Sequence, residues 1–114
     1  MRVINQAPLF QRFSGSGAIA VLAGPTDRMW AILEWRIHLG ASGGAGDTIV
    51  VSAKNTPDTP AFNTVMSSTS LNGVTDARVT TPYYLSAGQQ VAFVWTNSGA
   101  KSYGLEVFYE EYDE

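Results

Sequence analysis

At 114 residues, with 45% hydrophobic and only 15% charged side chains, the chain has the length of one domain and enough apolar residues to bury one core. Its net charge of −3 and its dispersed Lys and Arg residues exclude the clustered basic face that nucleic-acid binding requires. The lack of cysteine excludes disulfides and cysteine-based zinc sites, and no run reaches the ~18 apolar residues of a membrane span.

Residues 1–14 form an apolar stretch that predicts either an N-terminal arm or an edge strand. Residues 15–114 are expected to form a single β-sandwich domain that begins with an apolar strand over residues 17–23. The N-terminus has no apolar run followed by a cleavage site of small residues. We therefore expect a protein that is made in the cytoplasm and used without secretion.

The clearest predicted strand covers residues 28–39. One set of alternating positions is wholly apolar: Met29, Ala31, Leu33, Trp35, Ile37 and Leu39. The other set is Trp30, Ile32, Glu34, Arg36 and His38. Because side chains alternate between the two faces of a strand, this pattern predicts the first set in the core and the polar members of the second facing solvent or a partner.

The glycine-rich segment 40–46 follows, and residues 47–54 read as another strand with Ile49, Val51 and Ala53 on one face. The two strands together predict a long hairpin with a flexible tip. Pro57 and Pro60 then break the chain, because proline cannot donate a hydrogen bond to a central ladder.

The second half of the chain predicts further strands, near residues 62–66, 75–81, 89–96 and 103–109. In the last two strands the inner faces are expected to carry Val91, Phe93, Trp95 and Tyr103, Leu105, Val107, Tyr109. The fold class predicted is all-β, a two-sheet antiparallel β-sandwich of eight to nine strands. A jelly roll is favoured over an immunoglobulin-like topology because no Cys-Trp-Cys frame is present.

Few residues suit catalysis. The one histidine, His38, is predicted on the outward face of its strand beside Glu34 and Arg36. Glu34 and Glu106 are the best carboxylate pair for glycoside hydrolysis, but both occupy outward positions typical of solubilising surface groups. We therefore expect no enzyme activity, no cofactor and no metal.

Aromatic residues are more informative because they can form a core, a sugar-stacking platform or an assembly interface. Trp35, Phe93 and Trp95 are in phase with aliphatic neighbours and are expected in the core. Trp30, Tyr83 and Tyr84 fit a core or a contact role equally well. The candidate partner or subunit contacts are Val3, Ile4, Leu9, Phe10, Phe13, Trp30, Tyr83 and Tyr84.

The order of features over residues 17–109 resembles a family of small jelly-roll-like structural proteins of tailed bacteriophages. The matching features are the strand MWAILEWRIHL (29–39), the segments GDTIVV (46–51) and LNGVTD (71–76), the turn LSAGQ (85–89) with VAFVWTN (91–97), and the closing YGLEV (103–107). The resemblance implies a virion protein on the capsid surface, a decoration or cement subunit that binds and stabilises the lattice of the major capsid protein. It also implies a homo-oligomer, with a trimer favoured because jelly-roll subunits often pack around threefold axes.

Three alternatives stay open at this point. A tail or fibre component has the same fold, and a small enzyme would depend on His38. A carbohydrate- or receptor-binding module would require two or three aromatic residues in one flat exposed patch, chosen from Trp30, Tyr83, Tyr84, Tyr103 and Tyr112.

Overall fold

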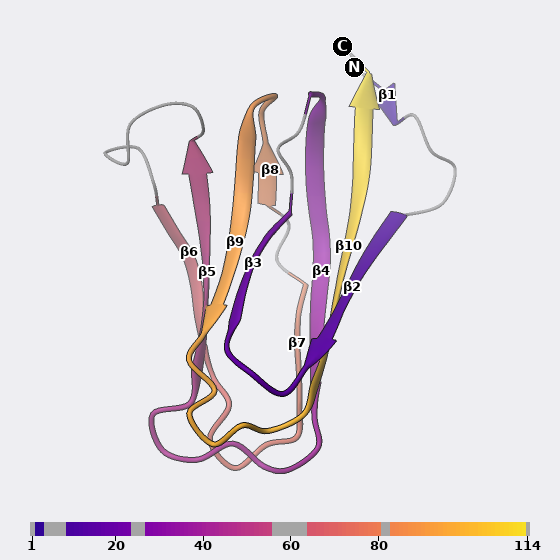
Figure 1. Cartoon of the computed structure of the whole chain (residues 1–114). Coiled ribbons are helices and arrows are strands. Elements are labelled where there is room, and N and C mark those ends of the chain that lie inside the picture. The colour runs from indigo at the N-terminus through magenta and orange to yellow at the C-terminus, as the bar shows by residue number, and fades with distance from the viewer. Residues whose placement is uncertain (1, 4–8, 24–26, 56–63, 81–82, 114) are drawn as a thin grey trace.

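The computed structural model describes residues 2–3, 9–23, 27–55, 64–80 and 83–113, and its regular elements are antiparallel β-strands in two sheets (Figure 1). No helix long and apolar enough to cross a membrane occurs in these ranges. The predicted all-β sandwich is confirmed. The strands in chain order are β1 (Arg2–Val3), β2 (Leu9–Gly15), β3 (Ile19–Ala23), β4 (Met29–Leu39), β5 (Thr48–Asn55), β6 (Thr64–Ser70), β7 (Asp76–Val79), β8 (Tyr83–Leu85), β9 (Gln89–Trp95) and β10 (Tyr103–Asp113).

The strand order is that of a jelly roll. In the six-stranded sheet, β1 and β2 pair with β10, β10 pairs with β4, and β7 and β8 pair with β4. In the four-stranded sheet the order is β3-β9-β5-β6. The chain therefore passes repeatedly from one sheet to the other, as the two Greek keys of a jelly roll require. The pairing of β1 with the end of β10 brings the described ends of the chain together, as Figure 1 shows.

The core lies between the two sheets and is built from alternating side chains. Val91, Phe93, Leu105 and Val107 are fully buried, which confirms the inner faces predicted for β9 and β10. Trp35 of β4 packs edge-on against Phe93, with ring centroids 5.8 Å apart and planes at 73°. This contact across the sandwich uses the geometry that aromatic pairs prefer.

The predicted alternation of β4 is wrong for its first half. From Trp35 to Leu39 the odd-numbered residues are buried as expected, but Trp30 and Ile32 also face the core. The register of β4 against β10 explains the change: Phe108 pairs with Glu34 and Tyr109 pairs with Ile32, so Leu33 is an extra residue in a β-bulge. Residues 30–33 are all apolar, and period two alone therefore cannot set their phase.

The predicted hairpin between β4 and β5 is also wrong, because the two strands belong to different sheets. The connection 40–46 crosses from one sheet to the other and is tied to the segment after β6. Gly43 N donates to Val74 O at 3.1 Å, and Gly73 N donates to Gly43 O at 2.9 Å. A Cβ atom on Gly43 would lie 2.1 Å from the Leu71 carbonyl oxygen, so only glycine allows this approach.

Asn97 holds the turn between β9 and β10. It is buried, and its φ of 47° lies in the left-handed region that asparagine tolerates better than most residues. Its amide nitrogen donates to the carbonyl oxygens of Gly17 and Lys101, both at 2.8 Å, and its Oδ1 accepts from Lys101 N at 2.9 Å. One side chain thus joins the start of β3 to the turn before β10.

Candidate functional site

The N-terminal contact candidates occupy different environments. Val3 lies in β1, where it pairs with Tyr112, and Ile4 lies outside the described residues. In β2, Leu9 and Phe13 pack against the core. Phe10 lies between them in sequence, faces outward and is 52% exposed.

The aromatic candidates are also divided. Trp30 is buried and stacks on Tyr109, with centroids 4.0 Å apart and planes at 17°, and Tyr83 is buried in the same core cluster. Tyr84 is 62% exposed. Of the predicted contact residues whose side chains the structure describes, Phe10 and Tyr84 are therefore the ones open to a partner, and both lie on the outer face of the six-stranded sheet.

Most of the aromatic residues considered for sugar stacking are not available as an open platform. Trp30 and Tyr83 are buried and therefore cannot stack on a sugar. Tyr103 and Tyr112 are only partly exposed, and Tyr103 packs edge-on against Trp95 with ring centroids 6.4 Å apart. Tyr84 is the one member of the set with a largely exposed ring in the described part of the chain.

The outer face of the six-stranded sheet carries a row of charges across four strands. The registers place Arg12, Glu106, Arg36 and Arg78 side by side on β2, β10, β4 and β7. Arg12 Nε donates to Glu106 Oε2 at 2.8 Å. Arg36 and Arg78 both donate through Nε to Glu34 Oε2, at 2.5 and 2.7 Å.

These ion pairs argue against glycosidase chemistry at Glu34 and Glu106. The hydrogen bond from Arg36 holds the pKa of the Glu34 carboxyl below its usual value, although partial desolvation acts in the opposite direction. A general acid in glycoside hydrolysis needs a raised pKa. Glu34 therefore acts as the acceptor that holds two neighbouring guanidinium groups.

Two aromatic rings extend the same face. Phe10 and Phe108 lie with their centroids 6.0 Å apart, and the guanidinium groups of Arg12 and Arg36 each sit 4.7 Å from the centroid of one of these rings. Such cation–π contacts hold long side chains over a sheet surface. This arrangement is not evident from the sequence, because it depends on pairing between β2 and β10, which are 94 residues apart at Arg12 and Glu106.

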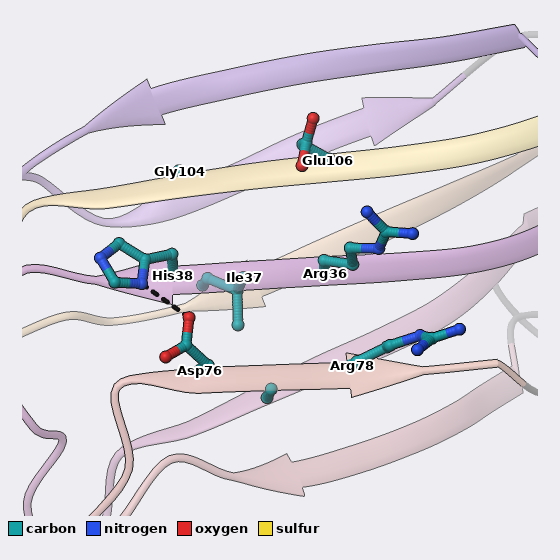
Figure 2. A pocket seen from close by; sticks show the side chains of 8 residues that line it. Arg36, Ile37, His38, Asp76, Arg78, Gly104 and Glu106 are labelled. Atoms are coloured by element: carbon teal, nitrogen blue, oxygen red, sulfur yellow. Dashed lines mark hydrogen bonds and ion pairs between the residues drawn. The ribbon is translucent and has the colours of Figure 1, made fainter.

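A shallow depression of about 290 Å³ lies on this face, where Gly104 contributes no side chain (Figure 2). His38 and Asp76 line it, and His38 Nδ1 is 2.6 Å from Asp76 Oδ1. Both side chains are 70% exposed. The hydrogen bond with His38 is the largest cause of a lowered pKa at Asp76, followed by one from Thr75.

The His38–Asp76 pair lacks a nucleophile. The side chains that line the depression are Arg36, Ile37, His38, Asp76, Ala77, Arg78 and Glu106, none of which is a serine, threonine or cysteine. Ser102 lines an adjoining depression with His38, but no hydrogen bond joins the two among the described residues. Nor does any group of three or more His, Asp or Glu in the described ranges have a geometry that would hold a metal.

The outer face of the four-stranded sheet has the opposite character. Lys54 is the only charged residue in its four strands, all of which the structure describes. Leu22, Val65 and Val94 are 49, 62 and 45% exposed. We call this surface the neutral face and define it by Ala20, Leu22, Val50, Ser52, Val65, Ser68, Ala92 and Val94. The neutral face is not evident from the sequence, because small apolar residues, serine and threonine occur on both the inner and the outer faces of these strands.

Comparisons with known proteins agree with the fold. No protein-family model matches the chain, and no curated protein matches its sequence at a significant level. A chain from the acid-stable capsid of Helicobacter pylori bacteriophage KHP30 is similar with a TM-score of 0.52 and 11% identity, over 99% of this chain and 98% of that one. The Drosophila NLP core, studied for pentamer formation and histone binding, is similar with a TM-score of 0.50 and 14% identity, over 94% and 99%. The chain therefore has a fold that a phage capsid also contains.

Proposed function

We propose that this chain is a non-enzymatic structural subunit of a bacteriophage virion, a decoration subunit that binds the lattice of the major capsid protein and stabilises it. The observation that carries the proposal is the likeness to a chain of the KHP30 capsid, which covers 99% of this chain and 98% of that one. The likeness spans nearly all of both chains, so a chain of about this length and fold occurs in a phage capsid structure. The sequence resemblance to small phage jelly-roll proteins supports the same conclusion.

The six-stranded sheet supplies the surface proposed to meet the lattice. Phe10 and Tyr84 are exposed on it, and the fixed row of arginine and glutamate side chains offers charged hydrogen bonds to a polar protein surface. Binding of this kind needs no catalytic residues. A subunit that binds only the assembled lattice stabilises it by mass action, by ~2.7 kcal/mol per site at 100 times its dissociation constant.

Co-sedimentation tests the proposal. Capsids assembled from the major capsid protein encoded in the same genome are pelleted with increasing amounts of the chain, and unassembled capsid protein is the control. We expect saturable co-pelleting, weaker binding by a Phe10→Ser, Tyr84→Ser double variant, and capsids that resist heating better when the chain is bound.

A chain that stays in the supernatant at saturating capsid would contradict the proposal. Binding to purified tails in its place would move the chain to the tail or fibre, and binding to a glycan array through Tyr84 would favour the carbohydrate-binding alternative. The trimer that the resemblance implies stays a prediction.

A further inference from the structure

The charges of the protein are divided unevenly between its two outer faces. Among the described residues, the four-stranded sheet has Lys54 as its one charged side chain. The outer face of the six-stranded sheet carries Arg12, Glu34, Arg36, Asp76, Arg78 and Glu106. Sheet faces that remain in water normally carry polar and charged residues. The neutral face therefore has the composition of a surface that is covered.

The neutral face is a regular array of side chains. Its residues form two rows across all four strands, Ala20–Val94–Val50–Ser68 and Leu22–Ala92–Ser52–Val65. In the first row the larger valines lie on the two central strands, β9 and β5, whereas in the second row alanine and serine lie there between leucine and valine, so the face has a ridge beside a hollow. This relief suits packing against another sheet, which requires side chains to interdigitate across ~10 Å.

The size of the face predicts a reversible contact. Four strands spaced by ~4.8 Å, with ~3.3 Å per residue over the seven residues of β6 or β9, make the whole outer face of this sheet roughly 19 by 23 Å, about 440 Å² in projection, and the neutral face is part of it. A standard interface buries about 800 Å² per partner, and weak ones bury less than about 600 Å². We therefore expect a weak, reversible contact and not a permanent complex.

We propose that the neutral face binds the neutral face of a second copy of this chain across a two-fold axis. A charged partner surface would lose its hydration against a face that offers it one cation, at Lys54, whereas a second neutral face loses no charge solvation. A two-fold axis brings the same patch together on both copies, so the face needs only to complement itself.

The net charge of −3 opposes self-association through the rest of the surface, which leaves the neutral face as the favoured contact. The pairing is independent of the proposed function, because the lattice contact was assigned to the other sheet. It joins copies in pairs, whereas the resemblance implies a trimer, and the mass of the purified chain distinguishes the two.

Sedimentation velocity without capsids tests the pairing. The purified full chain is measured from about 1 to 200 μM, a range that spans weak protein–protein affinities, and we expect a monomer–dimer equilibrium. Val94→Asp, in the central strand β9, places a carboxylate on both sides of the contact and should raise the dissociation constant about 100-fold or more. Ser14→Asp adds the same charge to the exposed outer face of β2 and should leave the dimer unchanged.

Crosslinking provides a second measurement that does not require a charged variant to fold. The chain has no cysteine, so a Val94→Cys variant carries a single thiol. A short bismaleimide should join two copies of Val94→Cys, and a Ser14→Cys variant treated in the same way should stay monomeric. Unchanged far-ultraviolet circular dichroism shows that each variant is folded.

Three results would overturn the pairing. These are a wild-type monomer at 200 μM, a trimer whose mass Val94→Asp does not change, and equal crosslinking of the two cysteine variants. A monomer that loses capsid binding in the Val94→Asp variant would show that the neutral face meets the lattice. A dimer that ignores capsids would contradict the proposed function and leave the pairing intact.

Discussion

The indole Nε1 of Trp95 donates a hydrogen bond to Oδ1 of Asp47, at 3.2 Å inside the protein. Asp47 also accepts from Gly44 N at 2.7 Å through Oδ2, and Lys101 Nζ lies 3.6 Å from the same oxygen. One buried carboxylate thus joins the core strand β9 to the connection between the sheets and to the turn before β10. This end of the jelly roll therefore depends on a polar contact as well as on apolar packing.

Replacement of Asp47 should make stability less dependent on pH. The Gly44 N–H is the largest cause of its lowered pKa, followed by the Trp95 indole. A carboxyl whose pKa is lower in the folded state stabilises the fold above its unfolded value of ~3.9, and this contribution is lost as the pH falls through the folded value. Asp47→Asn should therefore unfold at lower urea than wild type at pH 7, with a gap that narrows below about pH 4.

The exposed Asp27→Asn variant is the control for removal of one negative charge. A gap between wild type and Asp47→Asn that is the same at pH 7 and pH 3 would show that the carboxylate charge has no part in the contact.

Two of the buried tryptophans, Trp35 and Trp95, should respond differently to the same change. Trp35 Nε1 is buried and has no hydrogen-bond partner among the described residues, whereas Trp95 Nε1 donates to Asp47. Replacement by phenylalanine removes similar volume at both sites, for about 1–3 kcal/mol each. At Trp35 the replacement also removes a buried donor that has no described partner, which offsets part of the loss of stability. At Trp95 it removes the hydrogen bond to Asp47 and adds to the loss. Urea denaturation should therefore find Trp95→Phe the less stable variant, and the reverse order would contradict these roles.

Deletion of Leu33 should be tolerated, although it shortens a central strand. Without the extra residue, Glu34 and Ile32 pair with the consecutive residues Phe108 and Tyr109, and Trp30 and Ile32 keep their inward positions. Deletion of Ala31 instead turns Trp30 outward, because a one-residue shift moves a side chain to the other face. We expect a native near-ultraviolet spectrum for the Leu33 deletion.

The Ala31 deletion should lose ~2–3 kcal/mol or more, the free energy of burying one large apolar side chain. Urea denaturation of the Leu33 and Ala31 deletion variants compares their free energies of unfolding. Equal losses would show that the bulge does not set the phase of β4.

At Asn97, glycine should be a better replacement than alanine. Both lose the hydrogen bonds to Gly17 and Lys101, for about 1–3 kcal/mol, but alanine also pays ~1–2 kcal/mol for a left-handed φ. Ala100 has a φ of 52° and no side-chain hydrogen bonds to lose, so it tests the cost of the left-handed backbone by itself. Ala100→Gly should stabilise the protein by up to about 1 kcal/mol. Thermal melting of the three variants tests this order.

Regular alternation made much of the fold predictable. In β9 and β10, Ala92, Gly104 and Glu106 separate larger apolar residues, and the inner faces follow from period two. The bulge in β4 could not be predicted because residues 30–33 are all apolar, so either alternate set of them could face the core. Only the register against β10 shows which set does. The connection 40–46 could not be assigned because its glycine pattern fits a hairpin tip and a crossing between sheets equally well.

The candidate surfaces were less predictable than the core. Phe10 and Tyr84 were named from the sequence, but only the fold places them on one outer face and moves Trp30 and Tyr83 into the interior. The Arg–Glu row and the neutral face both depend on which strands are neighbours. A single sequence shows which residues are present but not which strands lie side by side, so it cannot bring these residues together on one surface.

Quantitative mass spectrometry of purified virions tests whether the chain is part of the capsid. The chain and the major capsid protein are counted in particles of the phage whose genome encodes both, after washing that removes unbound protein. We expect the chain in intact virions and in tail-free heads, at a fixed ratio to the capsid protein. Its absence from washed heads, with the capsid protein fully recovered, would contradict a structural role in the capsid.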